Sequence, residues 1–481
     1  MAARVRFQCA WRRRGISPTS LPLLLRAAMD PAAAALDHPP IPVYSTAARR
    51  SLSQANGGGD ELRPHHKPLS LWPGMYHSPV TAALWNARST LLERAVNSSN
   101  DGPSQVNLLT RAPGESRTSV LYNFVSDVAL REQYRNPWNN IRMGKLMEDL
   151  DALAGTIAMK HCADDDSTTR PLLLVTASVD KVSLKKPLRV DVDLKLAGAV
   201  AWVGRSSMKI QMQVIQPATG IAPCLRSPLH FTTFFSLSFT EIVTDESLAL
   251  VANFTFVARD SKTQKSAPVN HLSPETDEEK ALFAATEQLE LKRKQARSKQ
   301  PDQADDQRVQ QLLAEARVLT DMPALADKNS ILIQHTKLEN AIICQPQQRN
   351  LHGRIFGGFL MRRAFELAFS TCYVFGGHRP VFLEVDHVDF LRPVDVGDFL
   401  RFRSCVLYTE EENSARPKIH VEVKAIVTQP ESRSSQVSNT FHFTFTLDTS
   451  SSKSGDMVVR RVLPSTEEEA RRCVSRYDAD H

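Results

Sequence analysis

A loop that ends in two adjacent glycines, Gly357 and Gly358, is the first feature of this sequence that could take part in chemistry. The residues that follow, up to about 375, have the apolar spacing of an amphipathic helix. Glycines at a helix start leave the first backbone N–H groups accessible, at the end that carries partial positive charge. This arrangement suits a phosphate or a developing oxyanion. Two glycines alone more often indicate a tight turn beside close packing, so other residues must decide.

A carboxylate, Asp151, stands among apolar neighbours in a second predicted helix over residues 144–159. An unpaired carboxylate in a buried helix costs free energy. We therefore expect Asp151 to be hydrogen-bonded or functional. Its neighbours Glu148 and Asp149 are predicted to be solvent-facing helix charges.

The two predicted helices belong to two similar parts of the chain. The segments SVDKVSLKKP at 178–187 and EVDHVDFLRP at 384–393 share the pattern V-D-x-V-x-x-x-x-P. Each segment follows one of the helices and precedes long strands of alternating pattern. A helix followed by several antiparallel strands, given twice, predicts a duplicated α+β unit whose sheet wraps its helix.

The composition along the chain suggests how these units are arranged. The 481 residues are enough for two or three domains. The two repeats are predicted at 106–268 and 331–450, with a charge-dense helical connector at 269–330 between them. Residues 41–105 are rich in Ala, Pro, Ser and Gly and are predicted to be a leader with little fold of its own. Residues 451–481 are assigned to a tail.

The first 29 residues contain six arginines and no acidic residue. This composition is typical of a mitochondrial transit peptide, predicted here over residues 1–40, and predicts a location in the mitochondrial matrix. A disordered basic tail is the alternative. The formal net charge is +6, so the rest of the chain is neutral, which argues against a nucleic-acid partner. No apolar run is long enough for stable membrane insertion, and the scattered cysteines predict no metal site.

Four motifs together resemble the double hotdog acyl-CoA thioesterase family over about residues 110–450. They are the N-x-H-G-x-I-F-G-G loop, the E-D-L-D-A-L-A-G helix, the V-D-x-V-x-F-x-x-P-V-x-V-G-D strand entry and the G-R-S-S-M turn. The resemblance implies a tandem hotdog, in which each half has a long helix wrapped by an antiparallel sheet and the halves pair sheet to sheet. It implies hydrolysis of fatty acyl-CoA to fatty acid and coenzyme A, without a further cofactor. A homo-oligomer would also agree with the family.

The same resemblance implies roles for individual residues. Asp151 would be the general base or nucleophile, and Asn350 would orient the water or the thioester carbonyl. The amide of Gly358 would be the oxyanion donor. The coenzyme A-binding residues would be Arg205, Ser206, Ser207 and Gly357. Asn350 also has a simpler interpretation, in which it only caps a turn.

The comparison of the two copies predicts one composite site and one decayed site. The second copy has Phe365 where the first has Asp151, and the first copy has one glycine where the second has two. In place of the G-R-S-S-M turn the second copy has YTEEENSARPK, whose acidic residues, Glu410 to Glu412, would repel a phosphate.

Two other functions remain as alternatives. A hydratase or dehydratase of acyl thioesters would share the fold, but it typically uses a histidine together with a helix acid, and neither predicted helix segment contains a histidine. The other alternative is a catalytically inactive acyl-CoA-binding or structural mitochondrial protein. Release of free thiol from acyl-CoAs distinguishes an enzyme from such a protein.

Overall fold

A computed structural model describes Val80 and residues 107–163, 169–170, 172–216, 247–296, 303–350, 353–410, 417–448 and 459–480. The predicted transit peptide at 1–40, and the predicted leader apart from Val80, lie outside the described residues. No helix in the described part of the chain is long and apolar enough to cross a membrane.

The first repeat is one long helix and five principal strands. The helix is α4 (Met143–Cys162), and the strands are β2 (Thr118–Tyr122), β3 (Leu172–Leu184), β4 (Leu194–Val203), β5 (Ser207–Ile215) and β6 (Leu248–Asp260). Shorter elements flank them: β1 (Thr110–Arg111), α2 (Pro113–Ser116), α3 (Val128–Tyr134) and β7 (His271–Leu272). The predicted connector contains α5 (Asp277–Ala296) and α6 (Gln303–Asp321).

The second repeat has the same order of elements. Its long helix is α7 (Gly357–Gly376), and its strands are β9 (Leu338–Ile343), β10 (Pro380–Val385), β11 (Val388–Asp389), β12 (Phe399–Glu410), β13 (Lys418–Gln429) and β14 (Ser434–Leu447). Before β9 come β8 (Ser330–Leu332) and the short 3-10 helix η4 (Ile333–Thr336), and η5 (Pro346–Gln348) precedes α7. The chain then continues through β15 (Arg461–Leu463) and α8 (Glu467–Asp480).

The strands of both repeats form one antiparallel sheet. Its order is β2-β4-β5-β6-β3 in the first repeat and β10-β14-β13-β12-β9 in the second, and β3 pairs with β10 and β11 at the junction. The halves therefore join edge to edge, with Glu384 opposite Ser183. The strand order of the second half mirrors that of the first, as a duplication requires. The predicted α+β double hotdog is confirmed.

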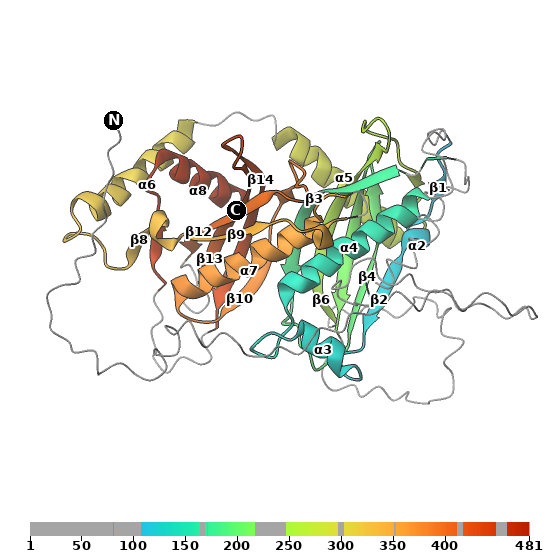
Figure 1. Ribbon diagram of the computed structural model, residues 1–481, viewed down its shortest axis with the longest axis horizontal. Helices are drawn as coiled ribbons and strands as arrows, with labels where there is room; N and C mark the ends of the chain where they lie inside the picture. Colours follow the sequence, from blue (N-terminus) through green and yellow to red (C-terminus); the bar gives the residue numbers. More distant parts are fainter. Residues whose placement is uncertain are drawn as a thin grey trace, which may run out of the picture. The chain divides into compact units, whose positions relative to one another are not determined.

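The apolar face of each long helix explains why the sheet wraps it. Fully buried apolar residues stand at three- or four-residue spacing along one side of each helix: Leu146, Leu150, Leu153 and Ile157 in α4; Met361, Ala364, Ala368 and Cys372 in α7. Alternate residues of the strands supply the opposite side of the core, as Ile210, Met212 and Val214 do in β5. Figure 1 shows α4 lying across the strands of the first repeat and α7 across those of the second.

Helix α8 occupies the place in the second repeat that α5 occupies in the first. Arg293 of α5 forms an ion pair with Asp180 of β3 at 2.7 Å. Arg476 of α8 forms the matching ion pair with Asp386, which recurs in the second copy of the V-D-x-V pattern, at 2.6 Å. The repeat unit thus includes the helix that follows its last strand.

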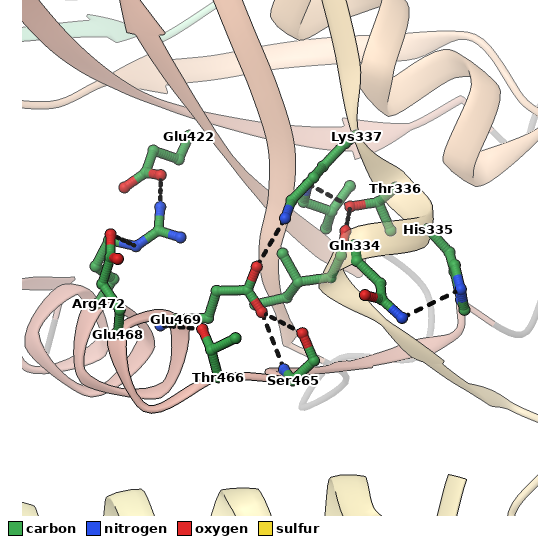
Figure 2. A network of polar contacts seen from close by, with 12 residues as sticks. Gln334, His335, Thr336, Lys337, Glu422, Ser465, Thr466, Glu468, Glu469 and Arg472 are labelled. Carbon is green, nitrogen blue, oxygen red and sulfur yellow. Dashed lines mark hydrogen bonds and ion pairs between the residues drawn. The ribbon is translucent and has the colours of Figure 1, made fainter. Parts of the chain in front are cut away.

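The start of α8 is fixed by a network of polar contacts (Figure 2). Glu469 accepts hydrogen bonds from the backbone amide and hydroxyl of Ser465 and forms an ion pair with Lys337 at 2.8 Å. Arg472 forms an ion pair with Glu422 of β13. Residues 459–480 of the predicted tail are therefore a folded part of the second repeat, which corrects that assignment.

Candidate active site

The carboxylate of Asp151 lies where α4 of the first repeat meets the start of α7 of the second. Its side chain is 1% exposed. One oxygen, Oδ2, accepts a hydrogen bond from the Gly358 amide at 2.7 Å, and Oδ1 accepts one from the Thr176 hydroxyl at 2.9 Å. Burial raises the pKa of Asp151 to about 7, although both hydrogen bonds favour the charged form. The carboxyl group can therefore gain or lose a proton near neutral pH.

Close packing explains why two glycines stand at the start of α7. A Cβ atom on Gly358 would lie 3.0 Å from the backbone Cα and O of Glu148 in α4. A Cβ atom on Gly357 would lie 3.1 Å from the ring of Phe390 and 3.4 Å from Oδ2 of Asp151. Neither glycine has a positive φ, unlike Gly353 in the preceding loop at +80°. The pair is thus required by the approach of α4 and Phe390, and it brings bare backbone to the carboxylate.

Asn350 shapes the loop before α7. Its side-chain oxygen accepts a hydrogen bond from the Arg354 amide at 3.1 Å, and its own amide donates to the Arg354 carbonyl at 2.6 Å. In the first repeat, Asn136 has the same position relative to α4, and its side-chain oxygen accepts a hydrogen bond from the Asn140 amide at 2.9 Å. Asn350 therefore caps the turn before α7, as the simpler interpretation predicted.

The Gly-Arg-Ser-Ser turn joins β4 to β5. Arg205 is exposed, its carbonyl accepts a hydrogen bond from Val269, and the Ser206 carbonyl accepts one from Ala258. Ser207 lies opposite Val257 in β6, and Thr176 lies opposite Phe256 in the same strand. The turn is therefore at the same end of the sheet as Thr176, roughly two strand spacings or 10 Å across it.

The equivalent place in the other half of the molecule is filled by aromatic rings. Phe365 of α7 takes the position of Asp151, and its ring lies 3.3 Å from the Cβ position of Gly144 in α4. Phe382 of β10 takes the position of Thr176, with its ring centroid 5.5 Å from that of Phe365. Two rings thus stand at the positions of the carboxylate and the hydroxyl, so the acid and its hydrogen-bond donor have no counterparts there.

Comparison with proteins of similar sequence shows the family to which this chain belongs. No family model matches the chain. Acyl-coenzyme A thioesterase 2, chloroplastic, of Humulus lupulus is 57% identical over 447 residues, which cover 92% of this chain and 97% of the relative. The chain belongs to the acyl-coenzyme A thioesterase family. The predicted family, the predicted acyl-CoA hydrolase activity and the predicted acyl-CoA substrate are thereby confirmed.

Two further relatives extend the comparison. Acyl-coenzyme A thioesterase 4, mitochondrial, of the same plant is 58% identical, over 91% of this chain and 80% of the relative. Acyl-coenzyme A thioesterase 9, mitochondrial, of Homo sapiens is 34% identical, over 71% and 73%. The names of the two plant relatives differ in organelle, so the predicted mitochondrial location is not settled by similarity.

The structure corrects the prediction that Glu148 and Asp149 of the thioesterase face solvent. Asp149 is 6% exposed and accepts hydrogen bonds from the hydroxyls of Tyr122, at 2.9 Å, and of Tyr134. Burial raises the pKa of Asp149 to about 6. The Glu148 side chain forms an ion pair with Arg362 of α7. The apolar spacing did not indicate the burial of Asp149 or the ion pair of Glu148. Almost all of α4 is buried, so these polar side chains contact other protein groups instead of water.

Two other interpretations of the sequence change, those of Glu410 and of histidine in the long helices. The Glu410 side chain is 8% exposed and forms an ion pair with Lys418 at 2.9 Å, so its charge is already neutralised; Glu411 and Glu412 lie outside the described residues. Helix α4 extends to Cys162 and so includes His161, which is buried and lies 2.9 Å from the Asn270 carbonyl. Ten residues of helix, about 15 Å, separate His161 from Asp151.

The sequence analysis did not identify Thr176 as a site residue, because a threonine in an apolar strand gives no signal that sets it apart.

Proposed function

We propose that this thioesterase hydrolyses fatty acyl-CoA at a single composite site, formed by α4 of the first repeat and the start of α7 of the second. The observation that carries the proposal is the hydrogen bond of 2.7 Å between Asp151 and the Gly358 amide. It joins a carboxyl group with a pKa of about 7 to a helix start, where a developing negative charge is stabilised.

In the proposed reaction, Asp151 acts as general base toward a water molecule that attacks the thioester carbonyl carbon. The carbonyl oxygen becomes negatively charged beside the first amides of α7, which have no partner within the helix. The C–S bond then breaks, and the proton held by Asp151 passes to the coenzyme A sulfur. In the alternative, the Asp151 carboxylate attacks the carbonyl carbon and the C–S bond breaks, so that the coenzyme A thiolate leaves and takes a proton from water. Water then hydrolyses the anhydride and restores the Asp151 carboxylate.

The contact between Asp151 and Gly358 suggests how the two groups work in sequence. While Asp151 is ionised, the Gly358 amide donates to its Oδ2 atom. When Asp151 takes the proton from water it loses its charge, and the amide is less strongly held. The amide can then donate to the oxyanion, whose charge appears at the same moment. Proton transfer and oxyanion stabilisation would thus be coupled through one N–H group.

The nucleotide end of coenzyme A is proposed to bind at the turn formed by Arg205, Ser206 and Ser207. A hairpin at 258–269 is hydrogen-bonded to this turn and presents further exposed cations: Arg259, Lys262 and Lys265. Clustered cations attract phosphate groups and raise the rate of encounter with them. Gly357 would contact the part of the substrate that lies nearest to the thioester.

The pH dependence of hydrolysis tests the role of Asp151. A general base works only when ionised, so kcat/KM should rise with pH through about 7. The Thr176 hydroxyl stabilises the ionised carboxylate, so Thr176→Val should raise the pKa and move this limb to higher pH by roughly one unit. The matched control is Thr156→Val, since the Thr156 hydroxyl donates to the Ala152 carbonyl within α4. A limb that stays in place in Thr176→Val would contradict the assignment.

A comparison of Asn350→Ala with Asn136→Ala tests the role of Asn350. Both asparagines cap equivalent turns, but only Asn350 precedes the composite site. If Asn350 orients water or the thioester carbonyl, its variant should lose roughly tenfold or more in kcat with a smaller change in KM, and Asn136→Ala should retain its kcat. Equal effects of the two substitutions on kcat and on thermal stability would leave Asn350 with a turn-forming role only. Steady-state kinetics and thermal unfolding distinguish these results.

The inactive-protein alternative has a direct test as well. Release of free thiol from a panel of acyl-CoAs, measured on the purified chain, must exceed the rate without protein. An acyl-CoA-binding protein that had lost turnover would show binding without thiol release.

For location we infer an organelle, and we retain the mitochondrial matrix as the proposed compartment. The arginine-rich, acid-free start of the chain supports an organellar address. Association into a homo-oligomer is likewise retained as a proposal.

A further inference from the structure

A second polar contact joins α4 to α7 beside the Asp151–Gly358 hydrogen bond. Glu148 Oε2 and Arg362 Nη1 form an ion pair at 3.0 Å, with side chains 22% and 14% exposed. Glu148 lies one helical turn before Asp151 in α4, and Arg362 lies one turn after Gly358 in α7. The two helices are therefore linked twice across their contact, by the hydrogen bond and by the ion pair.

The two partners of this ion pair occupy equivalent positions in the two repeats. Glu148 stands four residues after Gly144, and Arg362 stands four residues after Gly358. The glycines make matching contacts, because a Cβ on Gly144 would lie 3.3 Å from the Arg362 carbonyl oxygen and one on Gly358 would lie 3.0 Å from that of Glu148. The ion pair thus sits at the local two-fold axis that relates α4 to α7.

The position on this axis has a chemical consequence. In a pair of identical chains, two identical side chains would meet at the axis. A fused duplication allows opposite charges there, and this chain places the acid on the helix that carries Asp151. Glu148 lies one helical turn before Asp151 in α4, and its negative charge disfavours ionisation of Asp151.

We propose that Glu148 and Arg362 are a positioning pair of the active site: the pair holds the start of α7 against α4 and neutralises the charge that Asp151 faces. The proposal rests on the proposed role of Asp151 as the reacting carboxylate. Neither side chain is assigned a contact with substrate.

The surroundings of Asp151 and Arg362 make the charge of Arg362 important. The groups that face Asp151 are the Thr176 hydroxyl from β3, the Gly358 amide from α7 and Glu148 from α4 itself. Arg362 also contacts Glu366, at 3.2 Å, and Glu366 has two further partners in Arg363 and Arg142. Glu366 therefore keeps cationic partners without Arg362, whereas Glu148 has no other ion pair in the described part of the chain.

The pH profile of kcat/KM for acyl-CoA hydrolysis tests the pair. Arg362→Gln should expose Asp151 to the unneutralised Glu148 charge and move the acid limb to higher pH by roughly half a unit to one unit, for charges several ångströms apart. Glu148→Gln should move it to lower pH. The double variant should return close to the wild-type limb, and Arg362→Lys should restore most of it. The control is Arg363→Gln, because Arg363 pairs with Glu366 and not with Glu148.

The shifts of the acid limb in the Arg362 and Glu148 variants decide whether the ion pair positions the active site. Opposite shifts in the two single variants, with recovery in the double variant, support it. Lower activity at every pH with an unmoved limb would reduce the pair to a structural contact and overturn it. Failure of the proposed function has a different signature, because Asp151→Asn would then retain turnover whatever the Arg362 and Glu148 variants do. Thermal unfolding of each variant confirms that the measured protein is folded.

Discussion

Replacing Asp151 by asparagine is expected to lower kcat for acyl-CoA hydrolysis by roughly 10²-fold or more, the usual scale for loss of a general base. The substitution keeps the shape of the side chain and one acceptor oxygen for the Gly358 amide, which lies 2.7 Å from the carboxylate. Thr176 can either donate or accept at its hydroxyl. The variant should therefore fold and lose only its capacity to accept a proton or attack the carbonyl.

A matched control lies two residues away. Asp149→Asn makes the same substitution at a buried carboxylate of the same helix, whose hydrogen-bond partners are Tyr122 and Tyr134. It should keep kcat within a few-fold of wild type, because this cluster is not assigned to the site. The measurement is release of free thiol under saturating acyl-CoA. Near-normal turnover in Asp151→Asn, or equal losses in both variants, would contradict the assignment.

The same substitution has an expected effect on stability. Burial raises the pKa of Asp151 from 3.8 to about 7, so the folded chain keeps its proton to higher pH than the unfolded chain. The stability contributed by the protonated carboxyl is present at low pH and is lost as the pH rises from about 4 to about 7. Asparagine does not ionise, so the free energy of unfolding of Asp151→Asn, relative to wild type, should increase from pH 5 to pH 8 by up to a few kcal/mol. A catalytic carboxylate that destabilises its own fold would show this sign.

Reversing the charge of Arg205 is the second substitution with a large expected effect. Arg205→Glu removes an exposed cation from the proposed nucleotide turn and puts a negative charge beside the phosphates. We expect coenzyme A to bind roughly 10²-fold more weakly, with the loss decreasing at high salt because solvent-exposed charges are screened.

The control for Arg205 is another exposed arginine in a turn between strands. Arg433 lies between β13 and β14 of the second repeat and is exposed, with a φ of 53°. Arg433→Glu changes the net charge by the same amount as Arg205→Glu, but Arg433 lies in the second repeat, which contributes no residue to the proposed nucleotide turn. It should leave the affinity for coenzyme A within about twofold, as expected of a surface substitution away from the ligand. Equal weakening in both variants would indicate a general charge effect and remove Arg205 from the site.

The secondary structure and its duplication could be predicted from the sequence, because both depend on local patterns. The apolar spacing of 144–159 and 357–375 predicted α4 and α7 within a few residues. The two copies of V-D-x-V predicted β3 and the region of β10 and β11. Helix α8 was not predicted because its buried apolar residues are few and small: they are Ala470, Cys473 and Val474, and most of their neighbours are charged.

The partners within the site could not be predicted from spacing. Asp151 and Gly358 are 207 positions apart, and their hydrogen bond forms only because the two repeats bring their helices together. The family resemblance supplied that pairing, whereas the residue patterns alone left Gly357 and Gly358 as a turn. Thr176 and the Glu148–Arg362 ion pair became visible only with the fold. Phe365 was recognised by its place in the repeat, but its packing against Phe382 was not.

Titration of coenzyme A into the purified chain, followed by calorimetry, tests the claim of one composite site most directly. The place equivalent to the site is filled by Phe365 and Phe382, and its helix start has Gly144 in place of a glycine pair. We therefore predict one equivalent of coenzyme A per chain. Two equivalents per chain would show that both halves bind the ligand and would contradict the account.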